Sequence, residues 1–193
     1  MRAIWLWMLS GGGYLVFVDD DDYVSQSYLF DLYRAVARDV VSLSDAVSFD
    51  DATKVFEEDN ALHRDFLSRS HRKRYRIFSV KKFYGAPVRK LISRDIIGDR
   101  RFDTRFKNGE DTLFFFLISD RVRFSRPANA SAVYYRRCRA ESAHFARKTR
   151  IEKIRLGMNL MLTLCKYYFK NPLRYNLPFF ITRILGSLKI IIS

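Results

Sequence analysis

The sequence predicts an α/β fold in which helices flank a mixed sheet. The run "YLVFV" at residues 14–18 is β-branched and aromatic, as in a buried strand. Segments with helical spacing follow it, and strand-like runs return as "AVSFDDA" (46–52) and "SAVYYRRC" (131–138). With 193 residues the chain is long enough for one domain with a proper core.

Charge is divided unevenly along the chain. The net charge is +14, but residues 1–60 carry −8 and residues 61–193 carry +22. The basic part should meet an anionic partner, whether nucleic acid, membrane phospholipid or a phosphorylated substrate, and the acidic part should hold a cation. Cys138 and Cys165 have neither disulfide-framework nor zinc-site spacing, which favours a reducing compartment.

The first strand runs into four consecutive aspartates, residues 19–22. In an extended chain Asp19 and Asp21 share one side of the pleat, so they could converge on one hard divalent cation, Mg²⁺ or Mn²⁺. The alternative is an acidic turn or helix cap, with Asp22 or Ser25 capping the next helix. The alternative explains one aspartate well and four poorly.

The next segments favour a helix, a strand and an exposed stretch. Apolar residues from Tyr28 to Val41 recur near helical spacing and predict a helix on the sheet. The run 46–52 predicts a short strand, and the polar residues 54–73 predict an exposed loop or a loose helix. His63 and His71 within that stretch are interpreted as surface residues rather than metal ligands.

Residues 86–124 predict a short helix, an irregular basic segment and a second helix. The second helix should begin near Glu110 and Asp111, because Gly109 precedes them and acidic side chains favour a helix N-terminus. The run 131–138 then predicts one more strand.

Beyond about Ala140 the chain becomes helical and strongly apolar, with a break at Asn171-Pro172. No run is long enough to predict a spanning helix, so these segments are either interfacial helices with basic residues at the headgroups or two helices that close the core. The expected organisation is a main domain over residues 1–145 and a helical, membrane-associated segment over residues 146–193.

Three motifs taken together resemble the family 2 glycosyltransferases, inverting enzymes with a GT-A (Rossmann-like) fold. "SGGGYLVFVDDDDYVS" is similar to that family's Gly-x-Tyr, apolar strand and Asp-x-Asp-Asp pattern, with Asp20 in the variable position. "VRKLISRDIIGDRRFDTRFKNGEDTLFF" is similar to its Lys-Leu, Phe-Asp and Gly-Glu-Asp pattern, and "YYRRCRAESA" to its Tyr-Arg…Ser element. The resemblance covers residues 10–143.

The resemblance implies roles for the acidic residues. Asp19 would contact a nucleotide-sugar donor and the metal, and Asp21 with Asp22 would hold the Mg²⁺ or Mn²⁺ that bridges the donor diphosphate. Asp111 would be the general base that accepts the proton of the acceptor hydroxyl, and Glu110 would position it or the acceptor.

A cluster of arginines beside these motifs offers an anion-binding group. Arg136, Arg137 and Arg139 would reach the diphosphate as a cationic clamp, or they could form a solvated edge. His144 lies just beyond them. Family members carry a further N-terminal portion of the nucleotide-binding region before the Asp-x-Asp strand, so this sequence is expected to be truncated at its N-terminus.

The functional hypothesis is a metal-dependent inverting glycosyltransferase with a glycan or lipid-linked acceptor. We expect peripheral contact with an anionic membrane at its cytoplasmic face and no nucleic-acid partner. The main alternative is a non-catalytic basic module or inactive fragment that binds an anionic membrane or nucleic acid, since aromatics interleave with Arg in "RKRYRIF" (72–78). A haloacid-dehalogenase-type phosphatase is a third interpretation, but its later motifs are missing.

Overall fold

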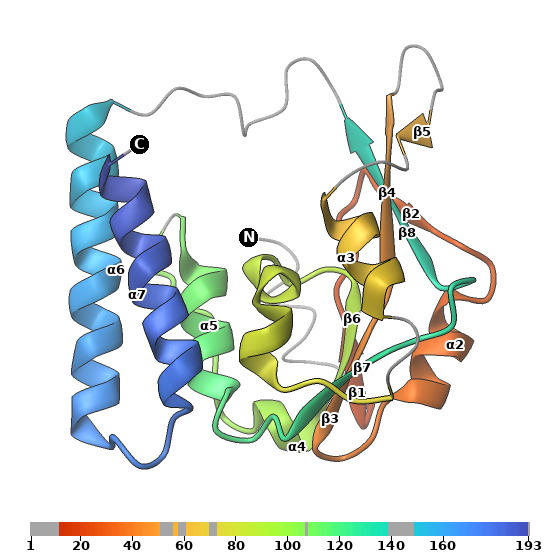
Figure 1. The fold of residues 1–193 in the computed structure, drawn as a ribbon, viewed down its shortest axis with the longest axis horizontal. Helices are drawn as coiled ribbons and strands as arrows, with labels where there is room; N and C mark the ends of the chain where they lie inside the picture. The colour runs from red at the N-terminus through yellow and green to blue at the C-terminus, as the bar shows by residue number, and fades with distance from the viewer. Residues whose placement is uncertain are drawn as a thin grey trace.

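The structure, a computed structural model, describes residues 12–50, 56–57, 61–69, 73–106, 108–138 and 149–192. The described strands form two four-stranded sheets (Figure 1). The first has the order β1 (Tyr14–Val16), β6 (Lys90–Ser93), β3 (Val40–Leu43), β7 (Phe124–Pro127). The second has the order β2 (Tyr23–Val24), β8 (Val133–Cys138), β4 (Asp45–Asp50), β5 (Phe56–Glu57).

Both sheets are mixed. β6 runs antiparallel to β1 and β3, whereas β3 and β7 are parallel. In the second sheet β8 is antiparallel to β2 and parallel to β4, and β5 is antiparallel to β4. Only Ser44 separates β3 from β4, so a single extended stretch passes from one sheet into the other.

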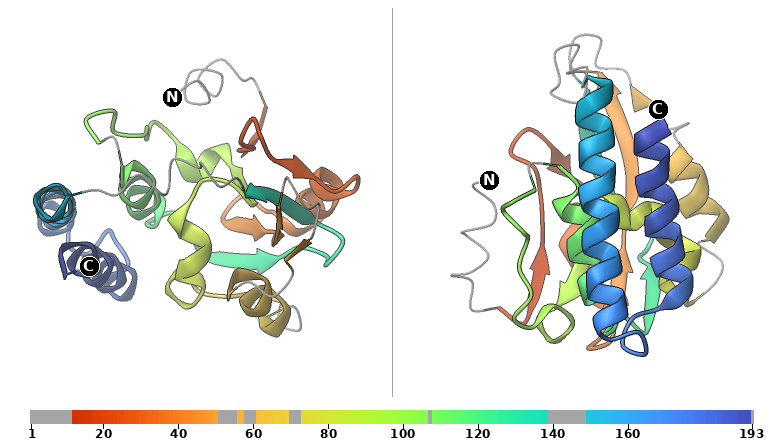
Figure 2. Two further views of the ribbon diagram at one scale, coloured as in Figure 1. Left: turned by 90° about the horizontal axis from the view of Figure 1, so that it is seen from above. Right: turned by 90° about the vertical axis from the view of Figure 1, so that its left-hand side faces the viewer.

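Helices cover the sheets on several sides (Figures 1 and 2). Every residue of β3 and β6 is buried, so neither strand shows the polar–apolar alternation of a half-buried strand, and Lys90 is the one charged residue among their apolar and small ones. The helical elements are α2 (Tyr28–Ala35), α3 (Ala61–Arg69), the 3-10 segment η1 (Ile77–Gly85), α4 (Arg94–Ile97), α5 (Glu110–Ile118), α6 (Arg150–Lys170) and α7 (Leu177–Ile192).

The helix expected up to Val41 ends earlier, at Ala35. Val36 is extended, and Ala37 and Val40 exchange two backbone hydrogen bonds of 3.2 and 3.1 Å that close a tight turn. Val40 and Val41 then enter β3, where β-branched side chains are favoured and both are buried. The helical spacing of these valines was therefore misleading.

The other elements agree better with the expectations. α5 begins at Glu110, and β4 and β8 occupy the expected strand positions. The segment 86–93 differs, because Lys90–Ser93 is a buried strand and the helix after it is only α4. Within residues 54–73, the stretch described as α3 is a helix anchored by Phe66, which is 1% exposed.

α6 and α7 form a helical hairpin whose inner faces join the main core. α6 starts with a capping box between Thr149 and Glu152. The rings of Tyr168 and Phe180 stack with centroids 4.1 Å apart, and Phe116 of α5 packs on Phe180. Among the described residues, none of the helices is long and apolar enough to cross a membrane.

The hairpin offers a matched pair of glycine substitutions. A Cβ on Gly157 would meet Ile191 Cγ1 at 2.5 Å and the Ser187 carbonyl oxygen at 2.8 Å, whereas a Cβ on Gly186 would meet nothing within 4 Å. Gly157→Ala should therefore lower the free energy of unfolding by about 1–3 kcal/mol through overpacking. Gly186→Ala should raise it by about 0.5–1 kcal/mol through helix propensity. Denaturant titration of both variants checks this, and changes of the same sign would contradict the packing.

Candidate active site

The acidic run forms a turn rather than a continuation of the strand. β1 ends at Val16, and the Asp22 N–H donates to the Asp19 carbonyl oxygen at 3.2 Å. The expected pleat geometry, which paired Asp19 with Asp21, is therefore wrong. Asp19 and Asp22 are the two aspartates that line the adjoining cavity.

Hydrogen bonds from β8 fix this turn. The Tyr134 hydroxyl donates to Asp22 Oδ2 at 2.6 Å and accepts from the Asp19 N–H at 3.1 Å. The Arg137 N–H donates to Asp22 Oδ1 at 2.8 Å. Burial and the bond to Asp22 raise the pKa of Tyr134 far above its usual range, so its hydroxyl keeps its proton and remains a donor.

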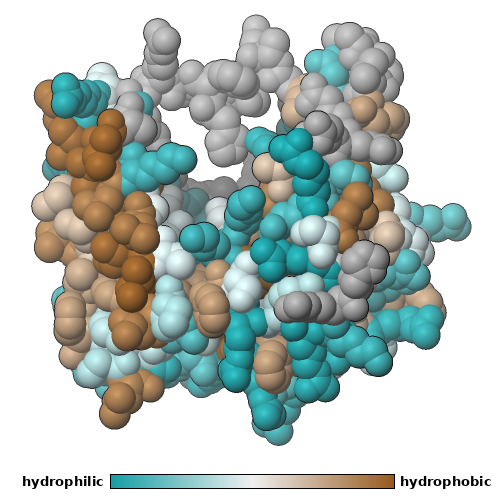
Figure 3. Space-filling model, in the orientation of Figure 1, coloured by the Kyte–Doolittle hydropathy of each residue, from teal (hydrophilic) through white to brown (hydrophobic). Residues whose placement is uncertain are grey.

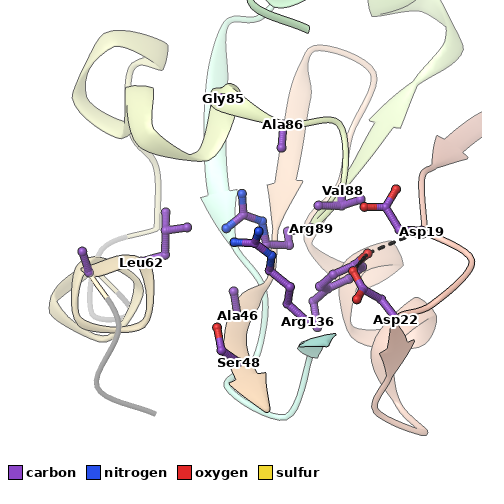
Figure 4. Close-up of a pocket in the computed structure, with 12 residues that line it drawn as sticks. Asp19, Asp22, Ala46, Ser48, Leu62, Gly85, Ala86, Val88, Arg89 and Arg136 are labelled. Carbon is purple, nitrogen blue, oxygen red and sulfur yellow. Dashed lines mark hydrogen bonds between the residues drawn. The ribbon is translucent and has the colours of Figure 1, made fainter. Parts of the chain in front are cut away.

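The cavity beside the turn has a volume of about 400 Å³, within the range of small-molecule sites. Strand alternation builds one wall, because the register partners Ala46 with Tyr134 and Ser48 with Arg136 project to the same face. Figure 4 shows the arrangement. The cavity is lined by Asp19, Asp22, Ala46, Ser48, Ala61, Leu62, Gly85, Ala86, Val88, Arg89, Tyr134 and Arg136.

Two guanidinium groups converge in this cavity. Arg89 and Arg136 extend toward the same region, across the cavity from Asp19 and Asp22 (Figure 4). Arg89 has a left-handed backbone with φ 70°, unusual for a residue with a side chain, and its buried Nε has no hydrogen-bond partner among the described residues. Burial and the nearby Arg136 lower the pKa of Arg89.

Of the three arginines expected to act together, the two that the structure describes, Arg136 and Arg137, are separated. Arg136 lines the cavity, whereas Arg137 projects to the other face of β8, with its guanidinium 5.7 Å from the Phe49 ring centroid. Arg139 and His144 lie outside the described residues. Sequence analysis missed Arg89, whose only signal is its place directly before the Lys-Leu pair.

Asp111 and Glu110 lie in the first turn of α5, after Gly109 with φ 87°. Neither lines the cavity, but Asp111 lies within electrostatic range of Asp19 and Lys90. Burial, reinforced by Glu110 and Asp19, raises the pKa of Asp111 to about 7. Glu110 Oε2 is buried and has no hydrogen-bond partner in the described part of the chain.

Asp19 and Asp22 could supply two carboxylates to a hard divalent cation. Burial, together with the charges of Asp22, Asp21 and Asp20, raises the pKa of Asp19, so a bound cation would relieve real repulsion. Within the described residues no group of three or more His, Cys, Asp or Glu forms a metal cluster. Mg²⁺ commonly takes one or two carboxylates and completes its shell with phosphate oxygens and water.

A second cavity, of about 410 Å³, lies on the opposite face of β4 and β8. His63, expected to be a surface residue, is only 17% exposed there, and its Nδ1 lies 2.8 Å from Asp45 Oδ2. Asp45 is buried and also accepts the Ala46 N–H at 2.7 Å. No local pattern indicates this pair, because its members lie 18 residues apart in the chain.

No protein-family model and no curated protein matches the chain. Among solved structures the chain is similar to S. aureus TarS 1-349, crystallised in complex with UDP-GlcNAc, with a TM-score of 0.60 and 16% identity. The match covers 98% of this chain and 49% of the TarS chain, so the chain spans about half of that structure's length. The predicted α/β class, a mixed fold flanked by helices, is confirmed, and the fold is similar to that of TarS.

The pKa of Asp111 gives a test of the site that needs no substrate. A carboxyl group with a raised pKa binds its proton more tightly in the folded state, so stability falls as the pH rises from 3.8 toward about 7. Asp111→Asn removes this effect. Near pH 8 the free energy of unfolding of the variant should exceed that of the wild type by about 1–2 kcal/mol, after allowance for solvent screening. Near pH 4 the two values should be equal. Urea titrations across pH check this, and a difference independent of pH would contradict it.

Proposed function

We propose that this chain is a family 2 glycosyltransferase that moves a sugar from a nucleotide-diphosphate donor to a glycan or lipid-linked acceptor, with inversion. The observation that carries the proposal is the cavity in which Asp19 and Asp22 face Arg89 and Arg136. A metal-bound diphosphate is a ligand class that uses both carboxylates and guanidinium groups in one site. TarS, the solved neighbour, was crystallised with UDP-GlcNAc, which makes a UDP-sugar the first donor to test.

The two arginines would hold the donor phosphates. Neither Arg89 nor Arg136 forms an ion pair with a carboxylate in the described part of the chain, and their mutual repulsion favours an anion between them. Guanidinium groups bind phosphate oxygens in a bidentate manner, which orients the donor as well as binding it. Arg137 would act through its backbone, by holding Asp22.

Asp19 and Asp22 would hold Mg²⁺ or Mn²⁺, with Asp21 as a further candidate from the same turn. When bound, such an ion neutralises charge that develops on the leaving diphosphate. Tyr134 keeps Asp22 oriented toward the cavity by a 2.6 Å hydrogen bond, so the acidic wall is fixed before a ligand arrives.

Asp111 would be the general base. A pKa of about 7 leaves about half of its carboxyl groups ionised at neutral pH and able to accept a proton. The acceptor oxygen would bond to the anomeric carbon while the carbon–oxygen bond to the diphosphate breaks on the other side. The hydroxyl proton would pass to Asp111. Glu110, whose Oε2 has no partner among the described residues, would position the acceptor hydroxyl.

Calorimetric titration with UDP and GDP, each with and without Mn²⁺, tests the proposal. We expect Mn²⁺-dependent binding of at least one nucleotide by the wild type. Asp22→Asn should abolish the metal dependence, and Arg89→Gln should weaken binding by about 10-fold to 100-fold through lost charge-assisted hydrogen bonds.

Arg38→Gln is the matched control, since it also removes one positive charge, from a side chain that is 86% exposed and paired with Asp95. It should bind as the wild type does. A folded wild-type chain that binds neither nucleotide, or equal binding by the Arg89 and Arg38 variants, would contradict the proposed donor site.

A further inference from the structure

Large apolar side chains remain exposed along the outer face of the α6–α7 hairpin. Figure 3 shows hydrophobic residues gathered over these two helices, while much of the surface over the sheets is hydrophilic. The residues of this outer band are Ile151, Ile154, Met158, Leu162 and Phe169 of α6, and Leu177, Ile181, Leu185 and Ile192 of α7.

The spacing of these residues gives each helix two apolar faces. Steps of three, four and seven residues place the outer-band side chains on one side of each helix. The buried residues Leu160, Leu164 and Tyr168 of α6 lie on another side and serve the core. A helix that needed only to close the core would carry polar residues on its outer side, so the outer band requires a separate explanation.

The two exposed stripes lie side by side. α6 and α7 approach so closely that Gly157 has no room for a side chain against Ser187 and Ile191. Figure 2 shows the two helices adjacent, end-on in the left view and lengthwise in the right view. The outer band therefore spans two neighbouring helices.

The positive charge of the hairpin favours an anionic partner. Residues 149–192 hold eight Lys or Arg and a single acidic residue, Glu152. A second copy of the same hairpin would bring like charges together, which disfavours self-association through this face. An apolar stripe with basic neighbours complements an anionic lipid surface. The exposed basic residues of the hairpin include Arg155, Lys166, Lys170 and Lys189.

We propose that the outer band of α6 and α7 lies on an anionic lipid bilayer, with its apolar side chains among the acyl chains and its basic side chains at the headgroups. The hairpin also touches the catalytic side of the molecule, because Gly109 lies against Leu156 and Leu160 of α6. Glu110 and Asp111 follow directly on the inner side of α6, so a hairpin on the membrane would hold them one helix diameter, roughly 10 Å, from the bilayer. On the proposed function, this arrangement suits a lipid-linked acceptor.

Sedimentation with vesicles of phosphatidylcholine, with and without about 30% phosphatidylglycerol, tests the surface. The full chain should bind the anionic vesicles more tightly than the neutral ones, and added salt should weaken that preference. The outer-band variant, Ile181→Ser with Leu185→Ser, should partition onto the vesicles about 10-fold or more weakly than the wild type. Lys166→Gln with Lys189→Gln should reduce binding to the anionic vesicles alone.

Leu29→Ser with Phe30→Ser is the control, because these side chains are similarly exposed, at 56% and 62%, but belong to α2. The control should sediment as the wild type does. Equal sedimentation of the outer-band variant and the wild type, or equal binding to both kinds of vesicle, would overturn the proposal. The proposal would also be overturned if the wild type formed a dimer that did not bind vesicles and the outer-band variant were monomeric.

The membrane proposal and the transferase proposal can be tested separately, because different variants should affect each. Asp22→Asn should bind vesicles like the wild type, since its position lies in the cavity and not on the hairpin. The outer-band variant should retain Mn²⁺-dependent nucleotide binding. Loss of nucleotide binding together with vesicle binding in the outer-band variant would show a general folding defect and would overturn the assignment of a separate surface.

Discussion

The hydroxyl group of Tyr134 holds the acidic turn in the shape on which the rest of the cavity depends. It donates to the Asp22 carboxylate and accepts from the Asp19 N–H, across more than 110 residues of sequence. Four adjacent carboxylates repel one another, so such a turn keeps one shape only where donors meet it. Because these donors come from β8, the position of the turn depends on the pairing of β8 with β2 and β4.

A buried cation shapes the opposite wall. Lys90 is fully buried; its ammonium group donates to the Ala86 and Val88 carbonyl oxygens and lies 4.6 Å from the Phe115 ring centroid. These bonds fold the backbone from Ala86 to Val88 around the lysine, and Arg89 follows with its left-handed backbone and its side chain in the cavity. Burial lowers the pKa of Lys90 well below its usual value, and the nearby charge of Asp111 partly offsets this. The lysine therefore connects the arginine wall with α5.

Local signals in the sequence predicted the parts of the site that depend on local structure. The acidic run after a strand, the start of α5 at Glu110 and the strand β8 each follow from spacing and capping preferences. The errors concern which face of a strand a side chain occupies and which distant residue it contacts. Whether Arg136 or Arg137 enters the cavity depends on which face of β8 is covered, and the pairing of Asp22 with Tyr134 depends on tertiary contacts. Arg89 gives no periodic signal, because its orientation is set by the buried lysine beside it.

Like charges lie close together around the cavity, which lowers the stability of the protein when no ligand is bound. Burial and then the neighbouring carboxylates raise the pKa of Asp19, burial and then Arg136 lower that of Arg89, and burial with Glu110 raises that of Asp111. A fold selected for stability alone would separate these like charges or pair them with opposite ones. Instead, carboxylates collect on one wall and guanidinium groups on the other (Figure 4). A ligand that combines a cation with phosphate groups would relieve both kinds of repulsion, which is the physical argument behind the proposed donor site.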